Sequence, residues 1–292
     1  MAEVTVLRQH AEEAAAALPP LLVAAERVAS TVAQGVHGRR RVGQGETFWQ
    51  FRQYEPGDPA TRIDWRESAK SQRLYVRETE WEAAQSVYLW RDGSPSMDYA
   101  SSRDLPTKRA RVDLLTLALA VLLVRGGERV TLLGSGLPVS HGRAVLERMT
   151  LVIARGGTSE SLPAFEPLPR HAQAVLMGDL LTPLAEVQAL VARFAASGLK
   201  GHLLQVLDPA EETLPFNGRV RFEGLEREEP LLISRVETVR EAYVERLARH
   251  REGLAAIARR AAWSFSVHRT DRPPHTALLA LYAALAPKQA WR

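Results

Sequence analysis

Beyond residue 83 the chain alternates short apolar runs that end in Gly or Asp with longer amphipathic stretches, and this alternation restricts its fold more than any other feature. The runs are too uniformly apolar for strands with one face in water, so both of their faces should be covered. The predicted strands span residues 86–90, 129–133, 174–177, 202–207 and 264–267, and the predicted helices span residues 108–124, 142–153, 184–196 and 236–261. Strands that alternate with helices in this way predict an α/β domain over residues 83–292, with a doubly wound, mostly parallel sheet.

Two segments of different character precede this domain. Residues 1–34 are rich in Ala, Leu, Val and Glu and are interrupted only by Pro19-Pro20, which predicts an N-terminal helical segment in two pieces. Residues 35–82 are dense in Gly, Arg, aromatic residues and turn signals such as Pro56-Gly57-Asp58, which predicts a small strand-rich subdomain. With 292 residues, of which 46% are hydrophobic, the chain is long enough for one large domain or two modest ones.

The composition excludes several kinds of site. The chain has no cysteine, which excludes disulfides, thiolate zinc sites and cysteine nucleophiles, so any metal must be held by oxygen or imidazole ligands. The start of the sequence lacks the pattern of a secretory signal. The longest apolar stretch, residues 114–124, is too short to cross a bilayer of about 30 Å and is expected to be a buried helix. We therefore expect a cytoplasmic protein without a transmembrane segment, and peripheral association with membrane proteins stays open.

Basic residues gather at two places, Arg39 to Arg41 and the group formed by Lys108, Arg109 and Arg111. The formal net charge is only +4, and neither group is accompanied by an aromatic platform or a nucleic-acid-binding motif. We expect both groups to be solvated side chains on exposed faces, and we expect no nucleic-acid partner.

The first predicted strand of the sheet ends in a loop with the chemistry of a cation site. It continues as Asp92-Gly93-Ser94-Pro95-Ser96, so one tight loop offers a carboxylate and two hydroxyls at alternate positions. Such hard oxygen donors are what Mg²⁺ or Mn²⁺ prefers. For this pentapeptide alone, the alternative is that Asp, Gly, Ser and Pro are common turn residues.

Two further residues are expected at the same edge of the sheet, because the carboxyl ends of parallel strands open into one set of loops. Thr158 follows the pair Gly156-Gly157, and its hydroxyl is either a cation ligand or a helix N-cap. Asp179 ends an apolar strand as Asp92 does, and it is placed to contact a cation directly or through a bound water.

Together the Asp-x-Ser-x-Ser loop, the glycine-preceded Thr and the strand-terminal Asp resemble the metal-ion-dependent adhesion site of von Willebrand factor A domains, over residues 83–267. The resemblance implies Asp92, Ser94 and Ser96 as loop ligands, Thr158 as the second-loop ligand and Asp179 as the third-loop acid. It also implies one open coordination position, which a carboxylate of a partner protein completes. The sequence departs from the pattern at Arg91, which precedes Asp92, and at Leu180, where the pattern has Gly. We expect Arg91 to be able to pair with a site carboxylate and weaken metal binding.

Residues 43–78 mix paired charges with aromatic residues and resemble the hallmark of the bacterial family known as domain of unknown function 58. The residues that carry this resemblance are Arg52, Tyr54, Gly57, Asp58, Arg62, Asp64 and Trp65, together with the later Asp208-Pro209-x-Glu211. The family resemblance implies a von Willebrand factor A-like domain and a link to MoxR-type AAA+ ATPases.

Physically, the charged side chains of this segment are predicted to form a salt-bridge network with aromatic rings packed between arginine planes. The charged members are Arg52, Asp58, Arg62, Asp64 and Arg66, and the aromatic members are Tyr54 and Trp65. We favour a structural role that holds the strand-rich piece to the sheet domain, because dense alternating charge usually satisfies itself before it binds anything else.

No catalytic motif stands out. The histidines show no HExxH spacing, and the sequence has neither a Gly-x-Ser-x-Gly elbow nor a phosphate-binding loop. The best enzyme hypothesis is a metal-dependent phosphohydrolase that uses Asp92, but Ser94 stands where such enzymes generally have a second aspartate. We expect no enzyme, but a metal-dependent protein-interaction module that acts with a MoxR-type ATPase on an unidentified protein client. A phosphohydrolase is the first alternative and a nucleic-acid-binding module the second.

Overall fold

The computed structural model describes residues 20–35, 47–54, 63–70, 73–80, 85–156, 160–225 and 229–285. The chain forms two compact units. The larger unit comprises Met1–Gly38 and Gln85–Arg292, and the smaller unit comprises Arg39–Ala84.

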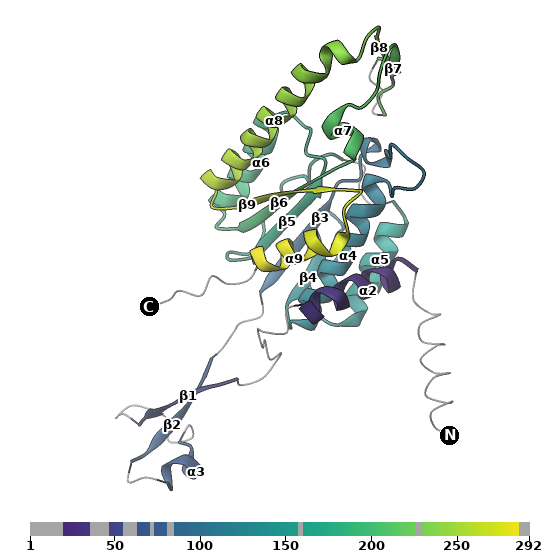
Figure 1. The fold of residues 1–292 in the computed structure, drawn as a ribbon. Coiled ribbons are helices and arrows are strands. Elements are labelled where there is room, and N and C mark those ends of the chain that lie inside the picture. The colour runs from purple at the N-terminus through teal and green to yellow at the C-terminus, as the bar shows by residue number, and fades with distance from the viewer. Residues whose placement is uncertain are drawn as a thin grey trace, which may run out of the picture. The chain divides into compact units, whose positions relative to one another are not determined.

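A five-stranded sheet forms the centre of the larger unit (Figure 1). Its strands are β3 (Ser86–Arg91), β4 (Arg129–Leu132), β5 (Gln173–Gly178), β6 (Lys200–Leu207) and β9 (Ser264–Arg269). Their order is β4-β3-β5-β6-β9, and every neighbouring pair is parallel. The predicted α/β class with a doubly wound parallel sheet is therefore confirmed, and each predicted strand coincides with one of these five.

Helices cover both faces of this sheet (Figure 1). One face packs against α4 (Lys108–Arg125), α5 (Arg143–Ala154) and α9 (Pro274–Leu285), and the other packs against α6 (Leu184–Ala196) and α8 (Glu237–Arg260). Helix α2 (Pro20–Gly35) packs on α4 and α9. Successive residues of β5 alternate between the two cores, since Val175 and Met177 belong to the first and Ala174 and Leu176 to the second. This alternation on two buried faces explains why the strands read as continuous apolar runs.

Helix α4 is buried along nearly its whole length, as its apolar sequence predicts. A helix that is apolar all round needs cover on its outer side as well as against the sheet. Helix α2 supplies part of that cover, because its buried residues Leu22, Ala25, Ala29 and Val32 lie in the same core as α4. The N-terminal segment therefore contributes α2 to the larger unit, while its first predicted helical piece falls outside the described residues.

Short elements follow β3 and β6. The 3-10 helix η2 (Pro95–Asp98) follows β3, and α7 (Pro209–Thr213) follows β6. The antiparallel pair β7 (Val220–Phe222) and β8 (Leu231–Ile233) lies between α7 and α8 and was not anticipated from the sequence.

The smaller unit contains an antiparallel pair, β1 (Thr47–Gln53) with β2 (Tyr75–Glu80), and the one-turn helix α3 (Trp65–Ser68). Asp64 caps α3 by accepting a hydrogen bond from the Glu67 N–H at 3.0 Å. Trp65 begins that helix and is 66% exposed. Gly57, Asp58 and Arg62 lie outside the described residues, as does the side chain of Arg52, and the salt-bridge network stays a prediction.

The packing of α2 leads to a stability prediction. Leu22→Ala should lower the free energy of unfolding by about 2–5 kcal/mol, because the leucine is fully buried against α4 and its loss leaves a cavity. Urea denaturation measures the change. The matched control is Leu181→Ala, at a leucine that is 45% exposed, where a change within about 0.5 kcal/mol is expected. Equal effects of the two substitutions would show that α2 is not part of the folded core.

Candidate cation site at the carboxyl end of the sheet

The predicted site residues lie where two neighbouring strands end. Asp92 directly follows β3, and Asp179 directly follows β5. Along the chain β3 is followed by β4, which lies on one side of β3, and then by β5, which lies on the other side. The ends of β3 and β5 therefore flank the topological switch point, where doubly wound sheets bind ligands. The Asp92 N–H also donates to the Met177 carbonyl at 2.8 Å, which extends the pairing of the two strands.

Gly178, the last residue of β5, allows this close approach. A β-carbon at Gly178 would lie 2.6 Å from Cβ of Asp92 and 2.8 Å from its Oδ2, closer than non-bonded atoms can come. Glycine is therefore the residue that lets the Asp92 side chain lie against the end of β5.

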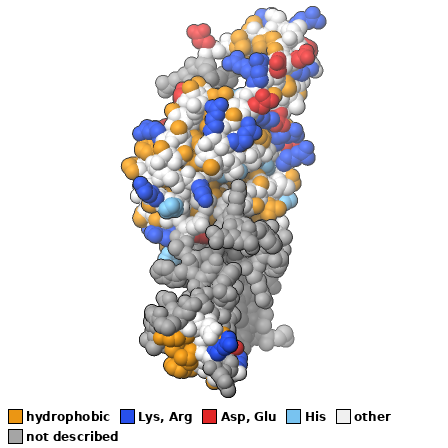
Figure 2. All heavy atoms as spheres, turned by 90° about the vertical axis from the view of Figure 1, so that its left-hand side faces the viewer, with side chains coloured by type: hydrophobic (Ala, Val, Ile, Leu, Met, Phe, Trp, Pro, Cys, Tyr) orange, Lys and Arg blue, Asp and Glu red, His pale blue; other side chains and the backbone are white. Residues whose placement is uncertain are grey.

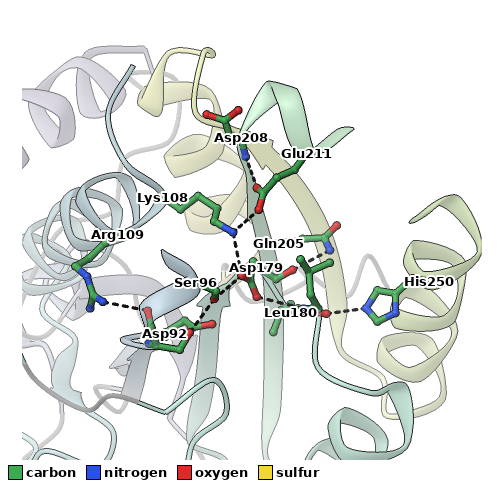
Figure 3. A network of polar contacts seen from close by, with 12 residues as sticks. Asp92, Ser96, Lys108, Arg109, Asp179, Leu180, Gln205, Asp208, Glu211 and His250 are labelled. Carbon is green, nitrogen blue, oxygen red and sulfur yellow. Dashed lines mark hydrogen bonds and ion pairs between the residues drawn. The ribbon is translucent and has the colours of Figure 1, made fainter. Parts of the chain in front are cut away.

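A continuous chain of hydrogen bonds joins the predicted ligands (Figure 3). Oδ1 of Asp92 accepts the Ser94 N–H at 2.8 Å and the Ser94 hydroxyl at 2.6 Å. The hydroxyls of Ser94 and Ser96 lie 3.0 Å apart, and Ser96 donates to Oδ2 of Asp179 at 2.8 Å. Four of the five predicted ligands are thus brought together, while Thr158 lies outside the described residues and its role stays a prediction.

Arg109 holds the backbone of this loop from outside. Its guanidinium donates to the carbonyls of Gly93 and Ser94, each at 3.0 Å, and forms an ion pair with Asp98 in η2. The loop conformation is therefore fixed from α4 as well as by its own turn residues.

The expectation for Arg91 is wrong. Its Nε pairs with Oδ1 of Asp113 at 3.1 Å and its guanidinium donates to the Gly156 carbonyl, so it contacts neither Asp92 nor Asp179. Adjacent residues of an extended chain point to opposite faces, and Arg91 shares the face of Leu89, against which α4 packs.

Leu180 takes the left-handed backbone conformation that glycine adopts without strain. Its φ is 50°, and its side chain is fully buried in the core that includes α6 and α8. The Leu180 carbonyl lies 2.7 Å from Nε2 of His250 in α8, while the Asp179 carbonyl accepts a hydrogen bond from Gln205 of β6 at 2.9 Å. Packing and backbone hydrogen bonds thus hold in place the turn that carries Asp179.

Lys108 is the site residue that sequence reasoning missed. It was expected on an exposed face, yet its side chain is 1% exposed, with Nζ 3.0 Å from Oδ2 of Asp179 and 2.6 Å from Oε1 of Glu211. Thr107 caps α4 immediately above the strand ends, so the first turn of the helix reaches the site. Arg111 is buried as well and donates to the carbonyls of Thr270 and Arg272, so the expectation of solvated side chains is wrong for this group.

Glu211 belongs to α7, at the end of β6. Its Oε2 accepts the Asp208 N–H at 2.8 Å, while Oδ1 of Asp208 accepts the Ala210 N–H at 2.8 Å, which makes a capping box. The sequence indicated Asp208 and Glu211 only through the family resemblance. In the structure this capping box holds Glu211 as the second carboxylate of Lys108, beside Asp179.

Burial shapes the electrostatics of the site. Burial, and next the Asp179 carboxylate, raises the pKa of Asp92 to about 6, against the opposing effect of the hydrogen bonds from Ser94. Burial lowers the pKa of Lys108, but the carboxylates of Asp179 and Glu211 outweigh it, so that this pKa is raised. Burial likewise raises the pKa of Glu211 against the effect of Lys108.

The donors present fit a hard divalent cation. Oδ2 of Asp92 is buried and has no hydrogen-bond partner, and Oδ1 of the same carboxylate is linked through two hydroxyls to a second carboxylate. Across the described part of the chain, no group of three or more His, Cys, Asp or Glu side chains could hold a metal ion. A cation at this edge would therefore depend on the serine hydroxyls as well as on the carboxylates.

The fold and the site together define a class of protein: a doubly wound α/β domain with a hydroxyl-rich aspartate loop at the switch point of its sheet. The chain belongs to the family described as "Protein of unknown function DUF58", which matches residues 50–253. The family predicted from residues 43–78 and 208–211 is thereby confirmed.

Relatives and solved structures give further comparisons. The uncharacterized proteins Rv1480 of Mycobacterium tuberculosis and Mb1516 of Mycobacterium bovis are each 27% identical over 278 residues, covering 88% of this chain and 85% of theirs. Among solved structures, an aerotolerance-related membrane protein from Bacteroides fragilis is 16% identical with a TM-score of 0.41, and the match covers 69% of this chain and 98% of that one. BatB from Bacteroides thetaiotaomicron is 13% identical with a TM-score of 0.40, covering 68% and 98%. The SpRpn10 VWA domain is 8% identical with a TM-score of 0.33, covering 68% and 94%.

Length and hydropathy exclude a membrane-spanning role for each helix that the structure describes, since none is both long and apolar enough to cross a bilayer.

The raised pKa of Asp92 predicts a stabilising substitution. The carboxyl ionises near 3.8 in the unfolded chain and near 6 in the fold, so the cost of ionised Asp92 is complete above about pH 6 and absent below about pH 4. Asp92→Asn keeps an oxygen for Ser94 and should raise the free energy of unfolding at about pH 8, without divalent cations, by up to about 3 kcal/mol. Thermal or urea unfolding should show this advantage shrink as the pH falls from 6 to 4. An advantage that does not vary with pH would contradict the assignment.

Proposed function

We propose that this protein is a protein-interaction module in which Mg²⁺ or Mn²⁺, held by the loop after β3, captures a carboxylate of a partner protein. The observation that carries the proposal is the buried, unpartnered Oδ2 of Asp92, whose sister oxygen Oδ1 begins a chain of hydrogen bonds through Ser94 and Ser96 to the carboxylate of Asp179. A buried carboxylate oxygen without a partner is costly, and cation binding is a common reason for proteins to retain one.

Each residue of the site has a defined part in this proposal. Asp92, Ser94 and Ser96 supply the direct oxygen ligands, and Asp179 contacts the cation directly or through a bound water. Thr158 completes the set by the resemblance to von Willebrand factor A domains. The bound cation supplies a charged coordination position that an oxygen of the partner can occupy. Arg109 keeps the loop in place through the carbonyls of Gly93 and Ser94.

The partner that we propose is a MoxR-type AAA+ ATPase, with which the protein matures or remodels other protein complexes in the cytoplasm. The support for this partner is the family resemblance of residues 43–78. The client is a protein, and peripheral association with membrane proteins is compatible with the proposal.

The two alternatives are supported less well. A phosphohydrolase centred on Asp92 would need a second carboxylate two residues later, and Ser94 there donates its hydroxyl to Asp92 instead. A nucleic-acid interface would need a basic surface, yet Lys108 and Arg111 are buried. On the face shown in Figure 2, Lys and Arg side chains of the larger unit lie scattered among hydrophobic and acidic ones. We therefore propose a role without catalysis.

Isothermal titration calorimetry tests the cation. The purified full chain should bind Mg²⁺ or Mn²⁺ weakly, and Asp92→Ala should abolish the binding because the central ligand is lost. Asp104→Ala, at an exposed aspartate, is the control and should bind as wild type does. Lowering the pH from about 7.5 to about 5 should weaken binding roughly tenfold, because protons compete for the Asp92 carboxylate. Indistinguishable isotherms for wild type and Asp92→Ala would contradict the site, and phosphatase turnover abolished by Asp92→Asn would favour the hydrolase.

A pull-down with the co-encoded MoxR-type ATPase tests the partner. If the cation bridges the two proteins, EDTA should release the complex and Asp92→Ala should prevent its formation. Substitution of Arg39 to Arg41 by alanine should matter much less. An interaction through a basic patch would behave in the opposite way, surviving EDTA and weakening steeply as salt rises. A complex that persists in EDTA but dissociates in modest salt would overturn the metal-dependent mechanism.

A further inference from the structure

The ammonium of Lys108 contacts one of the predicted cation ligands from inside the protein. It reaches Oδ2 of Asp179, the same oxygen that accepts the Ser96 hydroxyl and so closes the chain of predicted ligands (Figure 3). A lysine that is 1% exposed needs carboxylate partners, because an unpaired buried ammonium is very unfavourable. Asp179 is thus shared between the cation site and a cation that belongs to the chain.

The single ammonium does not neutralise all of the carboxylates in this cluster. The connected groups are the carboxylates of Asp92, Asp179 and Glu211 and the single ammonium of Lys108. When all are ionised, three negative charges face one positive charge, and the excess equals the charge of one divalent cation. The ammonium therefore neutralises part of the site, and Asp92 is the carboxylate that it does not contact.

Glu211 gives the ammonium a second place to bind. Its Oε1 lies 2.6 Å from Nζ of Lys108, closer than Asp179 at 3.0 Å, and its other oxygen is fixed by the Asp208 N–H. Because Glu211 is held by α7, it can keep the ammonium when Asp179 turns toward another cation.

We propose that Lys108 is a built-in competitor of the divalent cation for Asp179, and that Glu211 is the positioning residue that receives the ammonium when the cation binds. The inference rests on the proposed function and adds its regulation. Lys108 keeps cation affinity low, so the site fills only when cation and partner carboxylate act together. Without a cation, the ammonium ties the end of β5 to α7.

The test is a Mg²⁺ titration of the full chain by calorimetry, with Lys108→Met and with Lys200→Met as the matched control. Lys200 is exposed at the start of β6, at the opposite end of the sheet from the site. Lys108→Met should bind Mg²⁺ at least about tenfold more tightly than wild type, because a positive charge near the site is removed. Lys200→Met should bind as wild type does.

Glu211→Gln should act in the opposite direction. With Lys108 present, the ammonium is left with Asp179 alone, so Mg²⁺ binding should weaken by several fold. In the Lys108→Met background the same substitution should have a clearly smaller effect, because Glu211 then acts only at a distance. Equal effects in the two backgrounds would overturn the role of Glu211.

A stability measurement keeps the test decisive if Lys108→Met folds poorly. Loss of the Lys108 ammonium leaves two carboxylates without their partner. The melting temperature of Lys108→Met should therefore lie below that of wild type in cation-free buffer, and Mg²⁺ should raise it more than it raises that of wild type. Lys108→Gln, which retains hydrogen-bond donors without the charge, should show the same pattern.

Equal Mg²⁺ affinity and equal thermal response in wild type and both Lys108 variants would overturn this inference and leave the proposed function standing. An equal gain in Lys200→Met would also overturn it, since the effect would then come from net charge alone. No Mg²⁺ binding by any variant would overturn the proposed function and the inference together.

Discussion

The parallel pairing of β3 with β5 is the constraint on which the polar centre of this protein depends. It places the residues after the two strands side by side, and Gly178 lets the Asp92 side chain come within contact of β5. Burial is the main reason that the pKa of Asp92 is raised, and the Asp179 carboxylate at the neighbouring strand end is the next. Every other polar feature of this edge, from the serine hydroxyls to Lys108, can be understood as a response to those two carboxylates.

Helix α4 supplies the positive charge of Lys108, although a positive charge is unfavourable at the N-terminus of a helix. A helix N-terminus carries partial positive charge, so a lysine in the first turn is unfavourable unless acidic groups lie close. The first turn of α4 contains no acidic residue. Asp179 from the end of β5 and Glu211 from α7 provide the negative charge instead, so the helix start, the end of β5 and α7 meet at one ammonium.

The sequence allowed the fold and the loop of the site to be predicted, but not the residue at its centre. Strands with two buried faces and long apolar or amphipathic helices leave strong local patterns, and the strand-end positions of Asp92 and Asp179 follow from those patterns. Ser94 and Ser96 are adjacent to Asp92, so their convergence needed no tertiary information. Lys108 was misassigned because its role depends on Asp179 and Glu211, which are 71 and 103 residues away along the chain.

One local signal did point to Lys108. A lysine that opens an almost entirely apolar helix, with no acidic residue in the first turn, has no reason to be there for the helix itself. The packing of α2 on α4 had a comparable signal, since a helix that is apolar on all sides needs cover on its outer face. In both cases the sequence showed that a partner was required, and only the fold could show which one.

The charged side chains of the larger unit differ in the partners that they have. Arg111 donates to backbone carbonyls of Thr270 and Arg272, and Arg251 is held by Gln205 and Glu212, so both connect parts of the fold. Asp113 likewise has an ion pair with Arg91. Oδ2 of Asp92 is one of several buried side-chain atoms of the described residues without a hydrogen-bond partner, and it differs from Asp113 in that the nearby ammonium of Lys108 is bound to the next carboxylate.

Ion pairs of this kind add little to stability, since desolvation offsets their attraction, and well-packed apolar residues would serve a purely structural purpose as well. A centre in which one ammonium pairs with Asp179 and Glu211, while Oδ2 of Asp92 has no hydrogen-bond partner, is therefore consistent with the proposed exchange of cations. The tethered ammonium has a fixed reach and cannot diffuse away, so it can give up Asp179 without leaving the site. Under the proposed function, that property would keep the site intact during the exchange of a mobile cation and a partner protein.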